Sequence, residues 1–514
     1  MKNFLYSLCI ISLISCNSVK SHNQRINNPI SVKQLHQDID FTKKKLEELH
    51  PKLYWYISKD SLDRSFQSLK QQIKQPLKPN DLFALLAPEV AKVRQGHLNL
   101  SPLSKKYTKK ETKALTLQKG ILSRFKYWID DDKRLYILEN KDDYLNLKTG
   151  TEILEINGET VQSILHRYDP FITSDGFNTT HHKYALARRW PTYFTIEKGI
   201  LDSIQFKTLY EQKTDIFYAH REKTTLKEQK EDRKKLHDSL HLKENKTLHY
   251  NQKTGNFNRE LKFLDTDSTI AYMKIRSFSG ILSSQFYKKS FKTISDKKAK
   301  TLIIDVRDNL GGSLAEINNL YSYLDTDEKT FIKNLELTRK SSIHKTDYFK
   351  NMSLGGKFFG ALLYPFIYIG NTISVKKDNG GEYYYKSKYL TDIKKTNEHL
   401  FSGPLYVLIN GDSFSASSII AAKLKADNRA ILVGEETGGA NDGTVAGRYA
   451  TQTLPNTKLK LPIGIMLIKP NIIFSEKNKG VIPNIEIIPT KEEIFIKKDI
   501  QLEFIKEKIN SETR

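Results

Sequence analysis

Two loops of this 514-residue chain combine residue types that suit attack on a carbonyl group. In the first, RDNLGGS, Gly311 and Gly312 leave room for a ligand beside backbone N–H groups, and a predicted helix begins directly after them. In the second, GDSFSAS, Ser415 stands just ahead of another predicted helix and is followed by Ala416. We therefore predict a nucleophilic serine, Ser415, beside an oxyanion hole formed by the N–H groups of Gly311, Gly312 and Ala416.

Each loop taken alone also fits a structural role, because glycine pairs are common in turns and serines commonly cap helices. We interpret Ser413, Ser417 and Ser418 as helix caps of this kind. The chemical hypothesis therefore depends on a base for Ser415.

A base for the serine is available among the thirteen histidines. His97 lies in RQGHLNL, where Gly96 allows a turn between a predicted helix and a predicted strand. The alternative for His97 is a hydrogen-bonded structural histidine. His181 and His182 are adjacent, but no cysteine or carboxylate at ligand spacing accompanies them, so we expect neither a metal nor a cofactor.

The elements around these loops alternate between strand and helix. Apolar runs predict strands at 269–275, 301–306, 405–410 and 430–435, and amphipathic stretches between them predict helices at 284–295, 315–324 and 418–426. This order predicts an α/β sheet with helices on its faces. Because ligands bind at the carboxyl ends of the strands of such sheets, both loops are expected at one edge.

Four motifs in order carry a family resemblance. The runs LIIDVRDNLGGSLAEI, GDSFSASSIIAAKL, AILVGEETGG and EKNKGVIPNIEIIPT resemble the core of the C-terminal processing (tail-specific) serine peptidases. The likeness extends to LHPKLYWYISKDSLD and VRQGHLNLSPL, to TEILEINGETV and to DIQLEFIKEKI, which are similar to that family's helical N-terminal region, PDZ-like module and closing helix. The resemblance implies a multi-domain α/β protein with a crotonase-like (ClpP/crotonase) catalytic domain.

The residue pattern, together with this resemblance over the parts that it covers, gives a domain plan; the resemblance does not cover the lid insertion or the charged insertion. We expect a lipoprotein signal peptide at 1–15, a tether at 16–30, a helical N-terminal domain at 31–100, a PDZ-like β-rich segment at 112–200, a strand and charged insertion at 201–265, the catalytic domain at 266–490 with a lid insertion at 330–400, and a C-terminal helix at 491–514.

The catalytic residues follow from one branch of the family. In the processing-protease branch a lysine serves as base, but the matching position here is Ala440. The tricorn-like branch uses a histidine and a glutamate, which match His97 and Glu476. The resemblance thus implies a serine-type peptidase in which Ser415 attacks the peptide carbonyl, His97 transfers the proton and Glu476 orients the imidazole. The alternative for Glu476 is a surface carboxylate in a lysine-rich loop.

Three positions depart from the family pattern. Gln95, Ser418 and Asn484 stand where the family usually has acidic residues, and these changes are either neutral or weaken activity. Two other functions therefore stay open. One is an inactive peptide-binding scaffold of the same fold, and the other is a crotonase-type acyl-transfer enzyme.

The N-terminus predicts export. One lysine precedes an apolar run from Phe4 to Ile14, which is typical of a secretory signal. The tetrad ending at Cys16 resembles the bacterial lipobox, which implies that Cys16 carries lipid; the alternative is an ordinary cleaved signal peptide. Since Cys9 is the only other cysteine, the mature chain would have no free thiol. We expect a lipid-anchored, periplasm-facing protein of the bacterial cell envelope.

Charge and apolar patches restrict the partners. Lysine and arginine outnumber acidic residues by 24, but no nucleic-acid motif accompanies them, so we expect a solvated basic surface and no nucleic-acid partner. The expected partners are peptides or unfolded protein tails, and the membrane through the lipid. The apolar run 358–370 is interpreted as a lid or insert packed on the body, and the alternative is a membrane- or partner-contacting patch.

Overall fold

The computed structural model describes residues 18–513, apart from 142, 243, 253, 326–330, 351, 388–396 and 474–476. The predicted signal peptide and Cys16 lie outside the described residues. No described helix is both long enough and apolar enough to cross a membrane.

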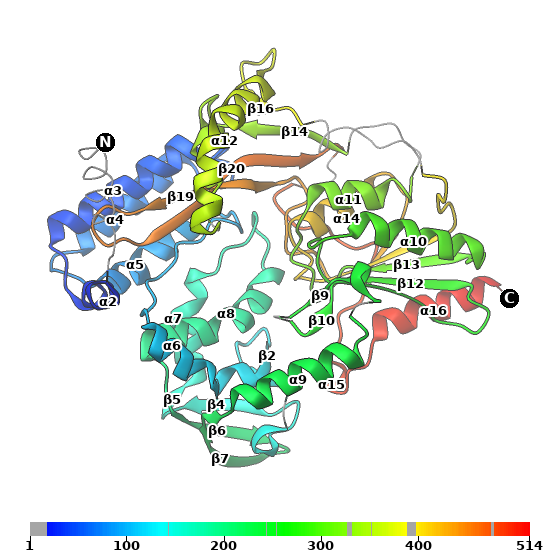
Figure 1. Ribbon diagram of the computed structural model, residues 1–514, viewed down its shortest axis with the longest axis horizontal. Coiled ribbons are helices and arrows are strands. Elements are labelled where there is room, and N and C mark those ends of the chain that lie inside the picture. The colour runs from blue at the N-terminus through cyan, green and yellow to red at the C-terminus, as the bar shows by residue number, and fades with distance from the viewer. Residues whose placement is uncertain are drawn as a thin grey trace, which may run out of the picture.

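Helices form the N-terminal part of the fold (Figure 1). Leu35, Ile39, Leu46 and Leu49 recur on one face of the second of them and are buried against its neighbours. The described helices here are α2 (Val19–Asn27), α3 (Val32–Leu49), α4 (Lys59–Gln72), α5 (Pro79–Ala91) and α6 (Lys109–Thr116).

The expected tether at 16–30 is wrong over its central part. Residues Val19–Asn27 form α2, and the Ser18 side chain caps that helix by accepting a hydrogen bond from the N–H of Ser21. Two hydrogen bonds join α2 to the rest of the protein. The Asn23 side chain donates to the carbonyl of Lys106 at 2.8 Å and accepts from the N–H of Lys106 at 2.8 Å. The sequence of α2 is polar, so its apolar content gave no sign of this contact.

A β-rich segment follows the helices. Its antiparallel sheet has the order β2-β3-β4-β6-β7, with a short β5 beside β4 after a turn at Asn157 and Gly158. The sheet continues to His220, so its last two strands lie beyond the predicted boundary at residue 200. The elements are β1 (Gln118–Lys119), η1 (Leu122–Arg124), β2 (Phe125–Ile129), β3 (Leu135–Asn140), η2 (Tyr144–Asn146), β4 (Glu152–Ile156), β5 (Glu159–Thr160), α7 (Val161–Tyr168), η3 (Asp169–Phe171), α8 (Thr180–Lys198), β6 (Ser203–Tyr210) and β7 (Lys213–His220).

The charged stretch after this sheet contains a helix. It is α9, and its leading threonine, Thr225, forms a capping box with Glu228. The elements of this stretch are β8 (Glu222–Lys223), α9 (Leu226–Ser239), η4 (Lys246–Leu248), β9 (Tyr250–Asn251) and β10 (Asn256–Phe257).

The catalytic part is built on a six-stranded sheet in the order β11-β12-β13-β17-β18-β21. All pairs are parallel except β11 with β12, which confirms the strand and helix alternation predicted from the sequence. The elements are β11 (Arg259–Phe263), β12 (Ile270–Ile275), α10 (Ser283–Asp296), β13 (Thr301–Asp305), α11 (Leu314–Tyr321), β17 (Leu405–Ile409), α14 (Ala416–Ala426), β18 (Ile431–Gly434), β21 (Ile485–Glu486), α15 (Lys491–Phe495) and α16 (Ile500–Thr513).

A second, antiparallel sheet has the order β15-β16-β14-β20-β19. Three of its strands come from the predicted insertion at 330–400, and β14 pairs with β20, so the insertion is a part of this sheet rather than only a lid. The elements are β14 (Ile332–Leu337), η5 (Ser342–Lys345), α12 (Leu354–Ser374), β15 (Val375–Lys377), β16 (Tyr383–Tyr385), β19 (Thr444–Thr453) and β20 (Lys460–Pro470).

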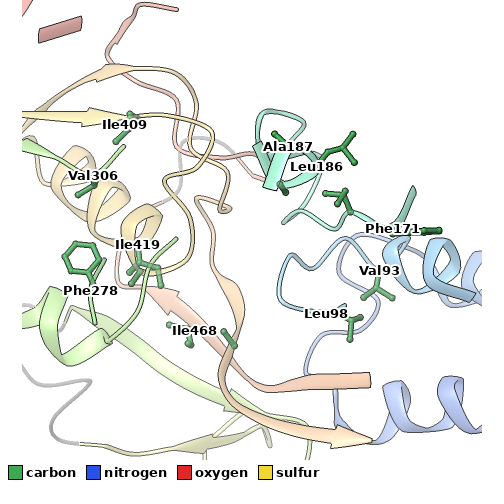
Figure 2. Packing of buried hydrophobic residues seen from close by; sticks show 14 of the residues in the cluster. Val93, Leu98, Phe171, Leu186, Ala187, Phe278, Val306, Ile409, Ile419 and Ile468 are labelled. Carbon is green, nitrogen blue, oxygen red and sulfur yellow. The ribbon is translucent and has the colours of Figure 1, made fainter. Parts of the chain in front are cut away.

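One continuous apolar core joins these parts, and Figure 2 shows a section through it. Val93 and Leu98 flank the Gly-His loop and belong to the same cluster as Val306, Ile409 and Ile419 from the catalytic sheet and its helix. Packing therefore holds the loop that carries His97 in a fixed position relative to the catalytic sheet.

Candidate active site

The two predicted loops meet at the carboxyl ends of β13 and β17. These strands are parallel neighbours, with Asp305 opposite Leu408, so the chain leaves both at the same edge. Asn309 joins the loops: its carbonyl accepts from the N–H of Phe414 at 3.0 Å and from the hydroxyl of Ser417 at 2.8 Å. The predicted convergence of the glycine loop and the serine loop is therefore present.

Gly311 lies in close contact with Ser415. Its φ is +96°, and a Cβ at this position would meet the carbonyl oxygen of Phe414 at 2.7 Å and both the N of Ala416 and the Cβ of Ser415 at 2.8 Å. No L-residue fits such a backbone without displacing the serine. The glycine is therefore required by close approach as well as by conformation.

Ser415 has an unusual backbone. It precedes α14 with φ 56° and ψ −119°, in the region with positive φ that non-glycine residues rarely adopt. Among the described residues, no hydrogen bond involves its hydroxyl. Strain of this kind costs roughly 1–3 kcal/mol and is concentrated at functional sites.

The neighbouring serines serve the backbone instead. The hydroxyls of Ser413, Ser417 and Ser418 donate to the carbonyls of Val306, Asn309 and Ser413, each at 2.8 Å. The prediction that they cap α14 is wrong, because no side chain caps this helix. Their hydrogen bonds fix the loop around Ser415. Of the four serines from 413 to 418, Ser415 is the one whose hydroxyl has no hydrogen bond among the described residues.

The three predicted oxyanion donors differ in availability. The N–H of Gly311 donates to the side-chain oxygen of Asn309 at 2.9 Å. Within the described chain, the N–H groups of Gly312 and Ala416 have no acceptor. Two free donors from opposite loops thus remain beside Ser415, and the third is occupied.

His97 lies beside the serine loop. Its ring centroid is 4.9 Å from that of Phe414, the residue directly before Ser415. Its Nδ1 is 3.0 Å from the hydroxyl oxygen of Tyr449, and its buried Nε2 has no partner among the described residues, so no hydrogen bond joins His97 to Ser415. Burial, with smaller contributions from the nearby His181 and Arg189, lowers the pKa of His97 to about 4. The imidazole is therefore neutral at pH 7.

His181 packs against the serine loop. Nδ1 of His181 lies 3.2 Å from the carbonyl oxygen of Gly411, and the ring stacks on Phe414 with centroids 4.7 Å apart. The ring of Phe414 therefore contacts both His97 and His181. Among the residues that the structure describes, no cluster of three or more His, Cys, Asp or Glu could hold a metal ion.

Sequence reasoning missed Asp175, which is fully buried. One carboxylate oxygen accepts from the N–H of Gly96 at 2.8 Å and the other lies 3.5 Å from the N of Ala440. Burial raises the pKa of Asp175 to about 6, and Asp442 nearby contributes. Asp175 thus connects the Gly-His loop to the loop that passes Ser415. The local sequence TSDGFN signals only a turn.

Tyr449 was missed for a similar reason. It lies in β19, 352 positions from His97, and nothing in its strand pattern marks it. Only the fold brings the two side chains together.

Glu476 lies outside the described residues. The residues that follow it lie against the site: the carbonyl of Asn478 accepts from the N–H of Phe177 at 2.8 Å, and Gly480 pairs with Ala440. The role of Glu476 stays a prediction.

The three departures from the family pattern have structural partners. The Gln95 side chain accepts from the N–H of Val445 at 3.2 Å, and that of Asn484 accepts from the N–H of Leu432 at 2.9 Å. The Ser418 hydroxyl bonds within its own loop. Each of these side chains therefore contributes to the framework around the site.

A large cavity reaches the edge of the site. Its volume is about 1850 Å³, and Leu310 and Asp412 from the two catalytic loops lie on its wall. Residues of β2, the edge strand of the β-rich sheet, also line the cavity. The cavity therefore borders both the β-rich sheet and the catalytic loops.

Comparisons with known proteins agree with this arrangement. Residues 269–487 match the model of peptidase family S41. The structure is similar to mature CPAF, with 16% identity, 91% of this chain and 94% of that chain covered and a TM-score of 0.58. It is also similar to mature CPAF complexed with lactacystin, with 17% identity, coverage of 91% and 96% and a TM-score of 0.59. No curated protein matches the chain.

These findings define the class of the protein. It is a multi-domain α/β protein with the fold of CPAF. The match of residues 269–487 to peptidase family S41 indicates that the chain is a serine-type peptidase.

Proposed function

We propose that the chain is a tail-specific type of peptidase that uses Ser415 and His97 with Glu476, as in the tricorn-like branch. The observation that carries the proposal is the unbonded hydroxyl of Ser415, held on a strained turn beside the free N–H groups of Gly312 and Ala416. Ala440 at the position of the family's lysine supports a histidine base over a lysine base.

The proposed reaction has two halves. The Ser415 hydroxyl oxygen bonds to the peptide carbonyl carbon while Nε2 of His97 accepts the proton, and the oxyanion accepts hydrogen bonds from Gly312 and Ala416. The amine then leaves with the proton from His97, and an acyl-enzyme remains. Water, deprotonated by His97, attacks the ester and restores Ser415.

Tyr449 supports this role of His97. When Nδ1–H donates to the Tyr449 hydroxyl, Nε2 carries the lone pair, which is the tautomer that a base needs. The free Nε2 of His97 is then the proton acceptor. Closing the contact with Ser415 accompanies substrate binding, since catalytic hydrogen bonds are often loose in free enzymes.

Peptides or unfolded protein tails are the proposed substrates. The edge of β2 borders the cavity, and an extended peptide can pair with such an edge through backbone hydrogen bonds. Leu310 and Asp412 of the catalytic loops line the same cavity, so a strand added to β2 would lie in a space that these loops border. We also propose that Cys16 anchors the enzyme, by lipid, to a bacterial envelope membrane on the periplasmic side.

An active-site label tests the proposal. A serine-directed phosphonate should modify Ser415, as mapped by mass spectrometry, and both Ser415→Ala and His97→Ala should lose casein hydrolysis by at least about 10³-fold with folding intact. Ser239→Ala, at an exposed serine of α9, is the matched control and should keep full activity. Equal turnover in Ser415→Ala would end the proposed mechanism.

The inactive scaffold remains the second candidate. It is favoured by the absence of a hydrogen bond between His97 and Ser415 in the described structure. A folded protein that binds peptide but neither turns over substrate nor takes the label would establish it.

A further inference from the structure

Helix α12 has an inverted distribution of polar and apolar side chains. A helix on a water-exposed surface normally turns its apolar side inward. On α12 the exposed fractions of the outward side chains run from 56% to 73%. These side chains are Phe358, Phe359, Leu362, Leu363, Phe366, Ile369 and Ile373.

The polar groups of α12 face the protein. Asn371 is buried and donates to the hydroxyl of Tyr348 at 2.6 Å, and the hydroxyl of Tyr364 donates to the carbonyl of His344 at 3.3 Å. The ring of Tyr368 stacks on His344 with centroids 3.9 Å apart. These contacts fix the orientation of the helix about its axis. The apolar side therefore faces outward because the inner side is held against the protein.

The contacts on the inner side of α12 also keep the helix attached to the body of the protein. Gly360 near the start of α12 lies against the ring of Phe349, and Asn371 near its end is tied to Tyr348. Figure 1 shows α12 at the end of the molecule that carries β14 and β16. Only the outer face is free, so α12 is suited to lie in a surface plane and not to leave the body.

The charges around α12 decide the partner. From 345 to 377 the sequence has five lysines and a single acidic residue, Asp347. Lys357 lies within the helix, and Lys376 and Lys377 follow its end; all three are exposed. Aromatic and aliphatic side chains between lysines at the two ends are the pattern of helices that bind in the headgroup region of anionic bilayers.

We propose that the outer face of α12 binds the surface of an anionic lipid bilayer. The apolar side chains enter the boundary between headgroups and acyl chains, while Lys357, Lys376 and Lys377 contact the lipid phosphates. This contact is independent of the proposed lipid at Cys16 and of the peptidase mechanism. It would hold the protein with this end of the molecule against the membrane.

Vesicle flotation tests the proposal. The chain used starts at Asn17, which keeps every described element and removes Cys16 and the apolar run before it. It should float with vesicles of phosphatidylglycerol and phosphatidylethanolamine. The double variant Phe359→Asp with Phe366→Asp should lose at least tenfold in partition coefficient, and Lys376→Ala with Lys377→Ala should lose about tenfold on anionic vesicles only.

The matched control is Ile216→Asp with Tyr218→Asp. These β7 side chains are 56% and 59% exposed, against 66% and 73% for Phe359 and Phe366, so the control makes the same charge change at large, well-exposed side chains. It should bind vesicles like the parent. Thermal melting checks that all variants fold.

A dye experiment covers the case in which the aspartate variant fails to fold. The chain from Asn17 has no cysteine, so Phe366→Cys and Ile216→Cys each accept one environment-sensitive dye. Anionic vesicles should shift the emission at 366 to the blue and leave that at 216 unchanged.

Three results would overturn the proposal. The first is a parent chain that stays in solution with anionic vesicles. The second is equal flotation of the parent and the folded aspartate variant. The third is a dimer, seen by sedimentation velocity, that the aspartate variant dissociates while vesicle binding is absent, since a second copy would then cover α12.

Discussion

Gly311→Ala is the sharpest perturbation of the proposed site, because the structure separates its two effects. The new methyl group would stand at φ +96° and would lie 2.7–2.8 Å from Phe414, Ser415 and Ala416. Gly199→Ala is a matched control: its φ is +84°, and nothing lies within 4 Å of the added Cβ. The control carries the backbone strain without the contact.

The expected magnitudes follow from this difference. The unfavourable φ costs about 1–3 kcal/mol of stability in both variants. At Gly311 the overpacking adds about 1–3 kcal/mol. Ordinary contact begins near 3.4 Å, so the serine loop must retreat by about 0.6 Å. A misplacement of about 1 Å costs about 10²-fold in rate, and we therefore expect kcat to fall by roughly 10- to 100-fold.

Two measurements check this expectation. Thermal or urea unfolding should show a similar loss in the free energy of unfolding from backbone strain in both variants, and an additional loss in Gly311→Ala. The rate of phosphonate labelling and kcat on a peptide substrate should fall only in Gly311→Ala. The reasoning is refuted if folded Gly311→Ala labels and turns over like Gly199→Ala, because Ser415 would then not depend on the glycine loop.

Two further predictions concern Glu476 and Cys16. In Glu476→Gln the acidic limb of the plot of kcat/KM against pH should have its midpoint near pH 4, where His97 gains its proton. In the parent enzyme a carboxylate beside the ring should raise this midpoint by about one to three pH units. Identical midpoints would exclude Glu476 as the partner of His97. Cys16→Ser should remove lipid from the protein, as measured by metabolic labelling with a fatty acid, and persistent labelling would contradict the lipobox assignment.

The catalytic sheet was largely predictable from the sequence. Its strands are continuous apolar runs such as 301–306 and 405–410, and such runs are typical of parallel strands buried on both faces. Glycine and serine loops mark where they end. The parallel order then brings Gly311 and Ser415 to one edge, because parallel neighbours share their carboxyl ends.

The second sheet was not predictable in the same way. Its strands β14, β16 and β20 lie far apart in sequence, and the pairing of Leu335 with Ile468 depends on a register that no local pattern encodes. The apolar run 358–370 was interpreted as packed on the body, since apolar residues usually lie inside. Most of its side chains are exposed instead, and this exposure depends on the folded surface rather than on the local pattern.

The site was predictable where chemistry depends on local motifs and not where it depends on long-range contact. Ser415 and its glycine loop are marked by their own sequence. Asp175 and Tyr449 reach the Gly-His loop from distant segments, and their types are common in turns and strands. The hydrogen bond from the N–H of Gly311 to the Asn309 side chain likewise depends on the fold of the loop and has no sequence signal.

The charge around His97 argues for an anion in the reacting enzyme. His181 and Arg189 join burial in lowering its pKa to about 4, which is far below the range in which a general base works best at neutral pH. Asp175 cannot restore proton affinity through a hydrogen bond to the ring, since its oxygens face the N–H groups of Gly96 and Ala440. Tyr449 is neutral, because burial raises its pKa above the usual value. A carboxylate that approached the imidazole from another segment would raise its pKa towards that range, and Glu476 is the residue that the family resemblance assigns to this place.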